Sequence, residues 1–302
     1  MGHRQSGGAG LTRWPRAQPE GKQAKHDGNQ HLGEDPPVLD DDAASYEDKV
    51  TSSELTKQGN QLIVAVDHGL YMGNMAKLDD VVGVAELAVR WGCDGLIVSP
   101  GFARPVQAVA GTVPLIVSLD TFWAGASGGE HGKLVAGVDQ AVRLGAAAVK
   151  LLLPTWDSGE LSRGLERVAQ VVRDASALSV KVVVEPVTVG EHPDDAELDI
   201  VGDAARVAAE IGADILKIPF PGAERLKSWT RIAPIPVWIL GGEPCNKDQV
   251  LQIVRTALRS GACGVAMGRN VWGRGLTAME EMMAELRNIL DDPEWSRRSG
   301  RA

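Results

Sequence analysis

The sequence predicts an α/β protein with one (β/α)8 domain, the TIM-barrel fold. Two observations support this prediction: eight short aliphatic runs, and the longer amphipathic stretches that alternate with them from about residue 50 onward. The runs are continuously apolar, as is typical of parallel strands that helices cover on both faces. The eight runs are LIVAV (62–66), GLIVS (95–99), PLIVSLD (114–120), AAVKLLL (147–153), KVVVEP (181–186), ADILKI (213–218), PVWIL (236–240) and GVAMG (264–268).

A repeated junction between helix and strand favours the same fold. Helical patterns span residues 81–92, 135–145 and 201–212, and each ends at a glycine, a common C-terminal stop for a helix. The junction recurs in WGCDGLIV, LGAAAVKLL, IGADILKI and SGACGVAMG. Repeated units of this kind predict a barrel. The alternative is an open doubly wound sheet, but no GxGxxG follows the first strand, so its dinucleotide-binding version has little support.

Composition divides the 302 residues into three parts. Residues 1–45 are rich in Gly, Gln, Pro, His and charged residues and have almost no aliphatic periodicity, so we expect a disordered tail there. Residues 46–290 form the predicted barrel, and residues 291–302 are expected to be a frayed C-terminus. The chain is 44% hydrophobic but holds only 8 Trp, 2 Tyr and 3 Phe, so the predicted core is aliphatic.

Net charge and cysteine content argue against several classes of protein. The formal net charge of −9 disfavours a nucleic-acid or acidic-membrane partner, because both attract a basic protein surface. The 3 cysteines lie far apart, which disfavours a disulfide scaffold or a zinc ribbon. No apolar run approaches the roughly 20 residues of a membrane span, and the first residues lack the apolar core of a secretory signal. We therefore expect a cytoplasmic protein.

Two lysines lie inside aliphatic runs, Lys150 in AAVKLLL and Lys217 in ADILKI. Lysine is seldom fully buried, because desolvation of the ammonium is costly and lowers its pKa, and a second ammonium nearby lowers it further. The neutral amine that results can attack a carbonyl and form a Schiff base. Alternatively, each lysine pairs with a buried carboxylate or reaches the barrel rim. Two such lysines, on strands two apart, favour the functional interpretation.

Acidic residues follow other predicted strands at the C-terminal face of the barrel, where the active sites of TIM barrels lie. Asp67 and His68 follow the first strand, Asp120 ends the third, and Glu185 ends the fifth. Each carboxylate also has a structural explanation: Asp67 and Asp120 suit turns or caps, and Glu185 suits an ion pair with a lysine. We interpret Asp67 and Glu185 as catalytic, and His68 and Asp120 as substrate-binding.

The loops after the last two strands predict a phosphate site. Gly241 and Gly242 follow the seventh strand, and Gly268 and Arg269 follow the eighth. TIM barrels often bind phosphate in these loops through backbone N–H groups and a helix N-terminus, and the arginine would add a charged clamp. Glycine pairs also occur for turn geometry alone, which is the structural alternative.

Several motifs together resemble a known enzyme family. VDHG, GADILK and PVWILGGEP followed by GVAMGRNVW are similar to the DeoC/LacD superfamily of class I, Schiff-base aldolases, and especially to the archaeal-type fructose-bisphosphate aldolases. The resemblance runs from about residue 60 to 275. AAAVKLLL and VVVEP also resemble a second branch, the tagatose-bisphosphate and sulfofructose-phosphate aldolases. The archaeal-type branch has a tyrosine at the end of its fourth strand, and LLLPTW offers none here.

The resemblance implies roles for individual residues. It implies that Lys217 forms the Schiff base, that Asp67 is the aspartate of the first strand, and that Lys150 is an auxiliary lysine. Because the tyrosine is missing, it implies that Glu185 moves the proton during C–C cleavage. The phosphate-binding elements of the family map onto Gly241, Gly242, Gly268 and Arg269.

The sequence therefore predicts a class I aldolase that acts on a phosphorylated ketose, without a metal or an organic cofactor, and we expect a homo-oligomer. Three alternatives remain open at this point. One is a metal-dependent aldolase or lyase with Asp67, His68, Asp120 and Glu185 as ligands. The second is a thiolase-like acyl transferase that acts on a phosphorylated ketone. The third is a phosphosugar-binding barrel without catalytic activity.

Overall fold

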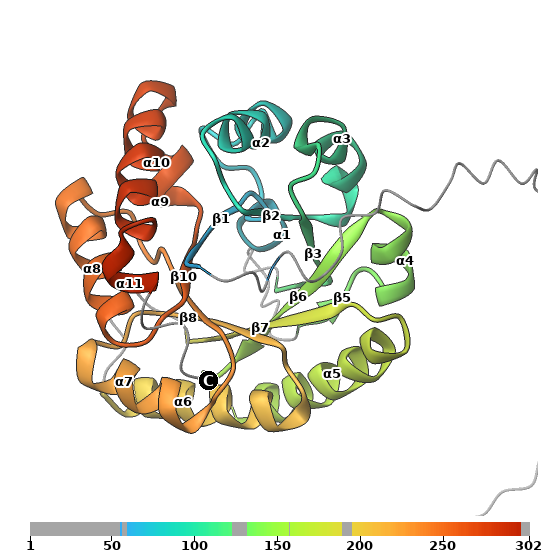
Figure 1. Cartoon of the computed structure of the whole chain (residues 1–302). Coiled ribbons are helices and arrows are strands. Elements are labelled where there is room, and N and C mark those ends of the chain that lie inside the picture. The colour runs from blue at the N-terminus through green and yellow to red at the C-terminus, as the bar shows by residue number, and fades with distance from the viewer. Residues whose placement is uncertain (1–54, 56–58, 123–131, 157, 189–194, 297–302) are drawn as a thin grey trace, which may run out of the picture. The chain divides into compact units, whose positions relative to one another are not determined.

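The computed structural model of the protein describes residues 55, 59–122, 132–156, 158–188 and 195–296. Eight parallel strands close into a barrel with helices around it (Figure 1), so the predicted (β/α)8 fold is confirmed. The tail predicted for residues 1–45 lies outside the described residues. The strands, in their order around the barrel, are β1 (Gln61–Ala65), β10 (Gly264–Met267), β9 (Val237–Leu240), β8 (Ile215–Ile218), β7 (Lys181–Val187), β6 (Ala146–Pro154), β3 (Leu115–Ser118) and β2 (Gly95–Val98).

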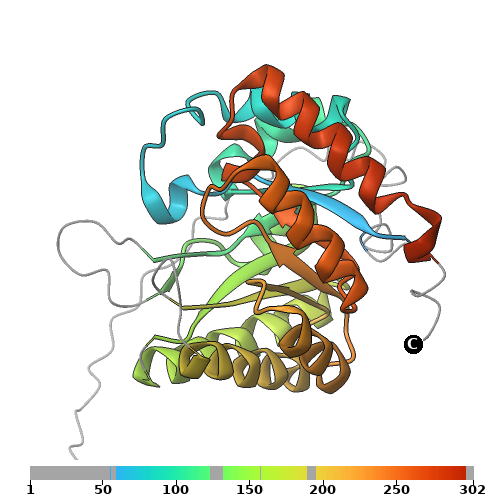
Figure 2. The ribbon, with the colours of Figure 1, turned by 90° about the vertical axis from the view of Figure 1, so that its left-hand side faces the viewer.

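Helices cover the outside of the barrel and bury apolar residues between themselves and the strands. In the turned view of Figure 2, the helices of residues 158–211 lie along one side of the barrel and the red helix of residues 276–290 lies along the other. The predicted helical patterns correspond to α2, α4 and α6. The longer helices are α2 (Val81–Arg90), α3 (Pro100–Ala110), α4 (Val138–Arg143), α5 (Ser158–Ala177), α6 (Asp195–Ile211), α7 (Ala223–Ile232), α8 (Lys247–Arg259) and α10 (Leu276–Leu290).

The barrel interior consists of an apolar layer with a polar layer above it. Alternate residues of a strand point to the same face, so the residues two positions beyond each apolar interior residue also face inward. On β6, β7 and β8 these next inward residues are Lys150, Glu185 and Lys217. The polar layer therefore lies toward the C-terminal ends of the strands. The apolar layer is formed by Ile63, Ile97, Ile116, Ala148, Val183, Ile215, Trp238 and Ala266.

Strand register makes the polar residues of this layer neighbours. Lys150 on β6 lies opposite Val183 on β7, two residues before Glu185. Val183 in turn lies opposite Ile215 on β8, which precedes Lys217 by two residues. Glu185 and Lys217 therefore occupy equivalent positions on adjacent strands, and Lys150 is the diagonal neighbour of Glu185 on the other side.

Two local features differ from the expectation. The third aliphatic run ends as a barrel strand at Ser118, and Asp120 belongs instead to β4 (Asp120–Thr121), which pairs antiparallel with β5 (Lys133–Leu134). The C-terminal segment, expected to be frayed from residue 291, includes the short helix α11 (Pro293–Ser296), in which Trp295 is buried under the guanidinium of Arg259. Among the described helices, none is long and apolar enough to span a membrane.

Candidate active site

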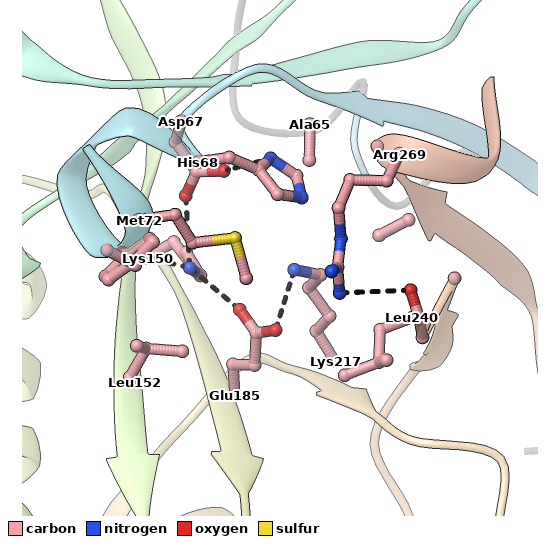
Figure 3. A pocket seen from close by; sticks show the side chains of 15 residues that line it. Ala65, Asp67, His68, Met72, Lys150, Leu152, Glu185, Lys217, Leu240 and Arg269 are labelled. Carbon is pink, nitrogen blue, oxygen red and sulfur yellow. Dashed lines mark hydrogen bonds and ion pairs between the residues drawn. The ribbon is translucent and has the colours of Figure 1, made fainter. Parts of the chain in front are cut away.

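A cavity of about 190 Å3 lies at the C-terminal ends of the barrel strands, where the sequence places its candidate residues. Figure 3 shows Glu185 between Lys150 and Lys217, with His68 and Arg269 across the cavity. Nine of the ten predicted site residues line the cavity, and Asp120 does not. The lining residues are Ala65, Asp67, His68, Tyr71, Met72, Lys150, Leu152, Glu185, Lys217, Leu240, Gly241, Gly242, Ala266, Gly268 and Arg269.

Glu185 joins the two buried lysines. Its Oε1 accepts a hydrogen bond from Lys217 Nζ at 2.8 Å, and its Oε2 lies 2.8 Å from Lys150 Nζ in an ion pair. Burial alone would raise the pKa of Glu185, but the positive charges of Lys150 and Lys217 lower it below its ordinary value. Glu185 is therefore a carboxylate at rest, in contact with both amines.

The second carboxylate of the site is Asp67, two residues after β1. It accepts hydrogen bonds from Lys150 Nζ at 3.1 Å and from Ser118 Oγ at 2.6 Å. Burial would raise the pKa of Asp67, but the charge of Lys150 is the main influence that holds it well below its ordinary value. Asp67 thus carries a negative charge, and it contacts Lys150 rather than Lys217.

The two lysines have opposite electrostatic environments. Burial would lower the pKa of Lys150, but Asp67 and Glu185 raise it well above its ordinary value. For Lys217, burial lowers the pKa and the charge of Lys150 adds to this effect, while Glu185 opposes it, and the net shift is downward. Lys150 is therefore a fixed ammonium, and Lys217 is the lysine that more readily becomes a neutral amine.

His68 is a neutral imidazole in the wall of the cavity. Burial, with the nearby positive charge of Lys217, lowers its pKa to about 4, although Asp67 opposes this shift. The ring stands edge-on to Trp272, with 5.3 Å between ring centroids. It also explains why residue 268 is glycine, because a Cβ on Gly268 would lie 2.1 Å from Cε1 of His68. Its Nδ1 is buried without a hydrogen-bond partner among the described residues.

The two predicted phosphate loops lie side by side at the rim of the cavity. The guanidinium of Arg269 binds Glu243 in a bidentate ion pair, with both N–O distances 2.8 Å. Asn270 Nδ2 donates to the carbonyl oxygens of Gly241, at 2.7 Å, and Glu243, at 3.0 Å, which fixes one loop against the other. Gly242 has φ of 65°, in the left-handed region that favours glycine.

Tyr71 and Asp120 form a further chain of contacts that begins at Lys150. Lys150 Nζ donates a hydrogen bond to the Tyr71 hydroxyl at 3.1 Å. The hydroxyl in turn donates to Oδ1 of Asp120 at 3.4 Å. The other carboxylate oxygen of Asp120 accepts the backbone N–H of Leu152 at 2.9 Å. Asp120 is fully buried behind Tyr71, so its expected contact with the substrate stays a prediction.

The family is decided by one match. Residues 61–274 match the model of the DeoC/LacD family of aldolases, which is more than half of the chain. The chain belongs to this family. The class I aldolase that the sequence predicts is thereby confirmed at the level of the family.

Known proteins similar to this aldolase share most of its length. The class 1 fructose-bisphosphate aldolase of Thermoproteus tenax is 33% identical over 227 residues, which cover 72% of this chain and 85% of that protein. The 2-amino-3,7-dideoxy-D-threo-hept-6-ulosonate synthase of Halobacterium salinarum is 30% identical over 214 residues, which cover 70% of this chain and 80% of that protein. A solved structure of a Schiff-base-forming fructose-1,6-bisphosphate aldolase is 28% identical, with a TM-score of 0.70 over 79% of this chain and 99% of that one.

Sequence reasoning missed Tyr71 as a component of this aldolase's site. Tyr71 lies in α1 (Gly69–Met72), four residues after Asp67, and it belongs to none of the motifs that indicated the family. The available signal was weak: it is one of only 2 tyrosines in the chain, and it follows a strand that ends in a candidate catalytic residue. Glu243 was also missed, although it lies inside the GGEP motif.

The metal-dependent alternative would require several acidic and histidine side chains to converge on one point. Within the part of the chain that the structure describes, no group of three or more His, Cys, Asp or Glu side chains is arranged to hold a metal ion. Lys150 lies between the carboxylates of Asp67 and Glu185. These two proposed ligands are thus joined by an ammonium in the described structure.

Proposed function

We propose that this aldolase cleaves or forms a C–C bond in a phosphorylated ketose through a Schiff base on Lys217. The observation that carries the proposal is the asymmetry of the two lysines around Glu185. Lys217 has one carboxylate partner and a lowered pKa, whereas Lys150 contacts two carboxylates and a hydroxyl. Attack on a ketone needs the neutral amine, so Lys217 is the better nucleophile.

Glu185 is placed to assist the proton transfers of imine formation, which water that enters the cavity relays when this carboxylate is replaced or displaced. Lys217 gives a proton to the carboxylate 2.8 Å away and attacks the ketone carbon as an amine. The same carboxyl group protonates the carbonyl oxygen, takes the proton released by the new C–N bond, and then protonates the hydroxyl that leaves as water. The product is an iminium on Lys217 with Glu185 again ionised, so charge and protons balance.

Cleavage uses the iminium as an electron sink. Glu185 takes the proton of the hydroxyl next to the scissile bond, the C–C bond breaks to release an aldehyde, and its electron pair moves to the nitrogen to form an enamine. Glu185 then protonates the enamine carbon, and water releases the second product. Asp67 is ionised, so we assign it an electrostatic role in carbinolamine dehydration, through Lys150, rather than donation of a proton.

The phosphate of the substrate would bind at Gly241, Gly242, Gly268 and Arg269. Three observations support this site. The two loops border the cavity that contains Lys217, the Asn270 side chain of one loop donates to backbone carbonyls of the other, and Arg269 supplies a guanidinium. Binding energy from such a remote group serves to position the reacting carbon.

The substrate sugar, fructose or tagatose bisphosphate or a related ketose phosphate, is part of the proposal. So are a cytoplasmic location, with which the free thiols Cys93, Cys245 and Cys263 agree, and a homo-oligomer.

The test is reductive trapping with borohydride in the presence of fructose 1,6-bisphosphate, tagatose 1,6-bisphosphate or dihydroxyacetone phosphate. We expect a mass increase on Lys217, mapped by peptide mass spectrometry, with and without a strong chelator. Lys181→Met is the matched control, because Lys181 pairs with Asp214 at the other end of the barrel. Absence of an adduct with every ketose phosphate, or activity that is lost to chelator and restored by a divalent metal, would contradict the proposal.

A further inference from the structure

The Lys150 ammonium has three N–H groups and three oxygen partners. These partners are Asp67 Oδ2 at 3.1 Å, Glu185 Oε2 at 2.8 Å and the Tyr71 hydroxyl at 3.1 Å. Lys150 is only 1% exposed, so water does not substitute for a missing partner without rearrangement. Two of the partners are charged residues already assigned to the reaction. The third, Tyr71, has no role in the mechanism above.

Tyr71 is itself held in place from behind. Its hydroxyl donates a hydrogen bond to Oδ1 of Asp120 at 3.4 Å. The other carboxylate oxygen of Asp120 accepts the backbone N–H of Leu152 on β6, the strand that carries Lys150. The Tyr71 ring also lies under the ammonium, with 4.6 Å from Lys150 Nζ to the ring centroid. The phenol is thus positioned by one fully buried carboxylate and contacts Lys150 through both its oxygen and its ring.

We propose that Tyr71 is a positioning residue of the aldolase reaction, whose hydroxyl, anchored by Asp120, holds the Lys150 ammonium against Glu185. The proposal rests on the proposed function in that Glu185 is the group that exchanges the proton. Loss of the Tyr71 hydroxyl is therefore expected to slow one step, C–C cleavage. Lys150 fixes the orientation of the Glu185 carboxylate, while imine formation depends first on the amine of Lys217, which Tyr71 does not contact.

Chemistry favours a positioning role over direct proton transfer by the phenol. Burial raises the pKa of Tyr71 well above its ordinary value, and the negative charges of Asp120 and Asp67 add to this, while the charge of Lys150 opposes it. The hydroxyl therefore stays protonated. A neutral hydroxyl can accept from Lys150 and donate to Asp120 at the same time. Removal of the hydroxyl takes away one of the two hydrogen-bond acceptors of this buried ammonium, so the position of Lys150 against Glu185 is less tightly defined.

The test compares Tyr71→Phe with wild type in three measurements: kcat for cleavage, KM, and the amount of imine trapped by borohydride in a single turnover. Tyr71→Phe keeps the ring and removes only the hydroxyl. We expect kcat to fall by about 10–100-fold, as for a small misplacement of a catalytic group, with KM and the trapped imine nearly unchanged. A kcat within twofold of wild type would overturn the proposal, as would an equal loss of trapped imine and of cleavage.

Thr121→Val is the matched control. The Thr121 hydroxyl donates to the carbonyl of Leu70, so it also ties the segment of Tyr71 to β4, but it does not contact Lys150. We expect this variant to keep its kcat. If Thr121→Val loses as much kcat as Tyr71→Phe, the effect comes from attachment of the segment and the proposal is wrong.

A second variant keeps the proposal testable if Tyr71→Phe does not fold. In Asp120→Asn, an amide N–H takes the place of one acceptor oxygen and competes with Lys150 for the lone pairs of the phenol. We expect Asp120→Asn to lose less kcat than Tyr71→Phe does and to keep its trapped imine. In the double variant we expect no loss of kcat beyond that of Tyr71→Phe alone. Additive losses would overturn the proposal. Absence of an adduct on Lys217 in wild type would instead refute the proposed function, so the two failures are distinguishable.

Discussion

Lys217 and Glu185 occupy equivalent positions on neighbouring parallel strands, and Nζ of the lysine lies 2.8 Å from Oε1 of the carboxylate. The amine and the base are therefore brought together by register, before any substrate binds. The second oxygen of the same carboxylate lies 2.8 Å from Lys150. One carboxylate thus contacts a lysine whose pKa is lowered and a lysine whose pKa is raised.

The first prediction distinguishes the two lysines. Lys217→Met is expected to abolish both cleavage and the borohydride adduct, because no other amine of the site has a lowered pKa. Lys150→Met is expected to keep the adduct and to lose cleavage by about 10²–10⁴-fold, because it disturbs the general acid/base. Trapping and steady-state assays measure both effects. An adduct that persists in Lys217→Met and disappears in Lys150→Met would reverse the assignment.

The second prediction concerns Glu185→Gln and its pH dependence. We expect cleavage to fall by about 10²–10⁴-fold while a trappable imine still forms. Glu185 raises the pKa of Lys217, and Lys150 lowers it while Asp67 raises it. Without the Glu185 charge, the pKa of Lys217 falls further, so the neutral amine persists to lower pH.

Single-turnover trapping between pH 5 and 9 measures this shift. The acidic limb of the rate of imine formation is expected to move to lower pH in Glu185→Gln than in wild type. Movement to higher pH would contradict the assigned pairing of Lys217 with Glu185. Cleavage at close to the wild-type rate would mean that Glu185 is only a structural partner of the lysines.

The third prediction compares two glycines of the phosphate loops. A Cβ on Gly268 would lie 2.1 Å from Cε1 of His68 and 3.0 Å from the carbonyl oxygen of Ala65, so Gly268→Ala forces the cavity wall to shift. A Cβ on Gly241 would meet its nearest atom, on Met267, at 3.4 Å, which is an ordinary contact. We expect Gly268→Ala to lower the free energy of unfolding by about 1–3 kcal/mol, and Gly241→Ala to change it little.

Urea unfolding measures this difference, and circular dichroism confirms that both variants are folded. Equal stabilities of the two variants would contradict the close packing of His68 against Gly268. A rise in KM for the phosphorylated substrate in Gly241→Ala, at unchanged stability, would support the phosphate site.

The fourth prediction concerns the ion pair between Arg269 and Glu243. The pair is partly exposed, and its carboxylate competes with a phosphate for the same guanidinium. Glu243→Gln removes the negative charge and leaves Arg269 available, so KM for the phosphorylated substrate is expected to fall by about two- to fivefold, in keeping with the small energy of exposed pairs. Arg269→Met is expected to raise KM. Steady-state kinetics measures both, and an increase in KM for Glu243→Gln would contradict competition.

The sequence by itself determined the fold and predicted nine residues that line the cavity. Continuous aliphatic runs are a local signal for buried parallel strands, and a lysine or glutamate within such a run stands out because burial of an isolated charge is costly. The barrel topology then places the ends of these strands at one face, so Lys150, Glu185 and Lys217 were predicted to lie at that face, with one lysine as the partner of Glu185. Glycines after the last two strands indicated the loops of the cavity in the same way.

Only the tertiary structure decided which lysine is the easier one to deprotonate. Both lie in similar apolar runs, and the difference arises because Asp67, two residues after β1, contacts Lys150 and not Lys217. The contact of Tyr71 with Lys150 joins residues 79 positions apart, and Asp120 is positioned by a short strand that the pattern did not predict. Side-chain pairing and pKa depend on distances of a few ångströms between separate strands, and a linear pattern of residue types contains no such distances.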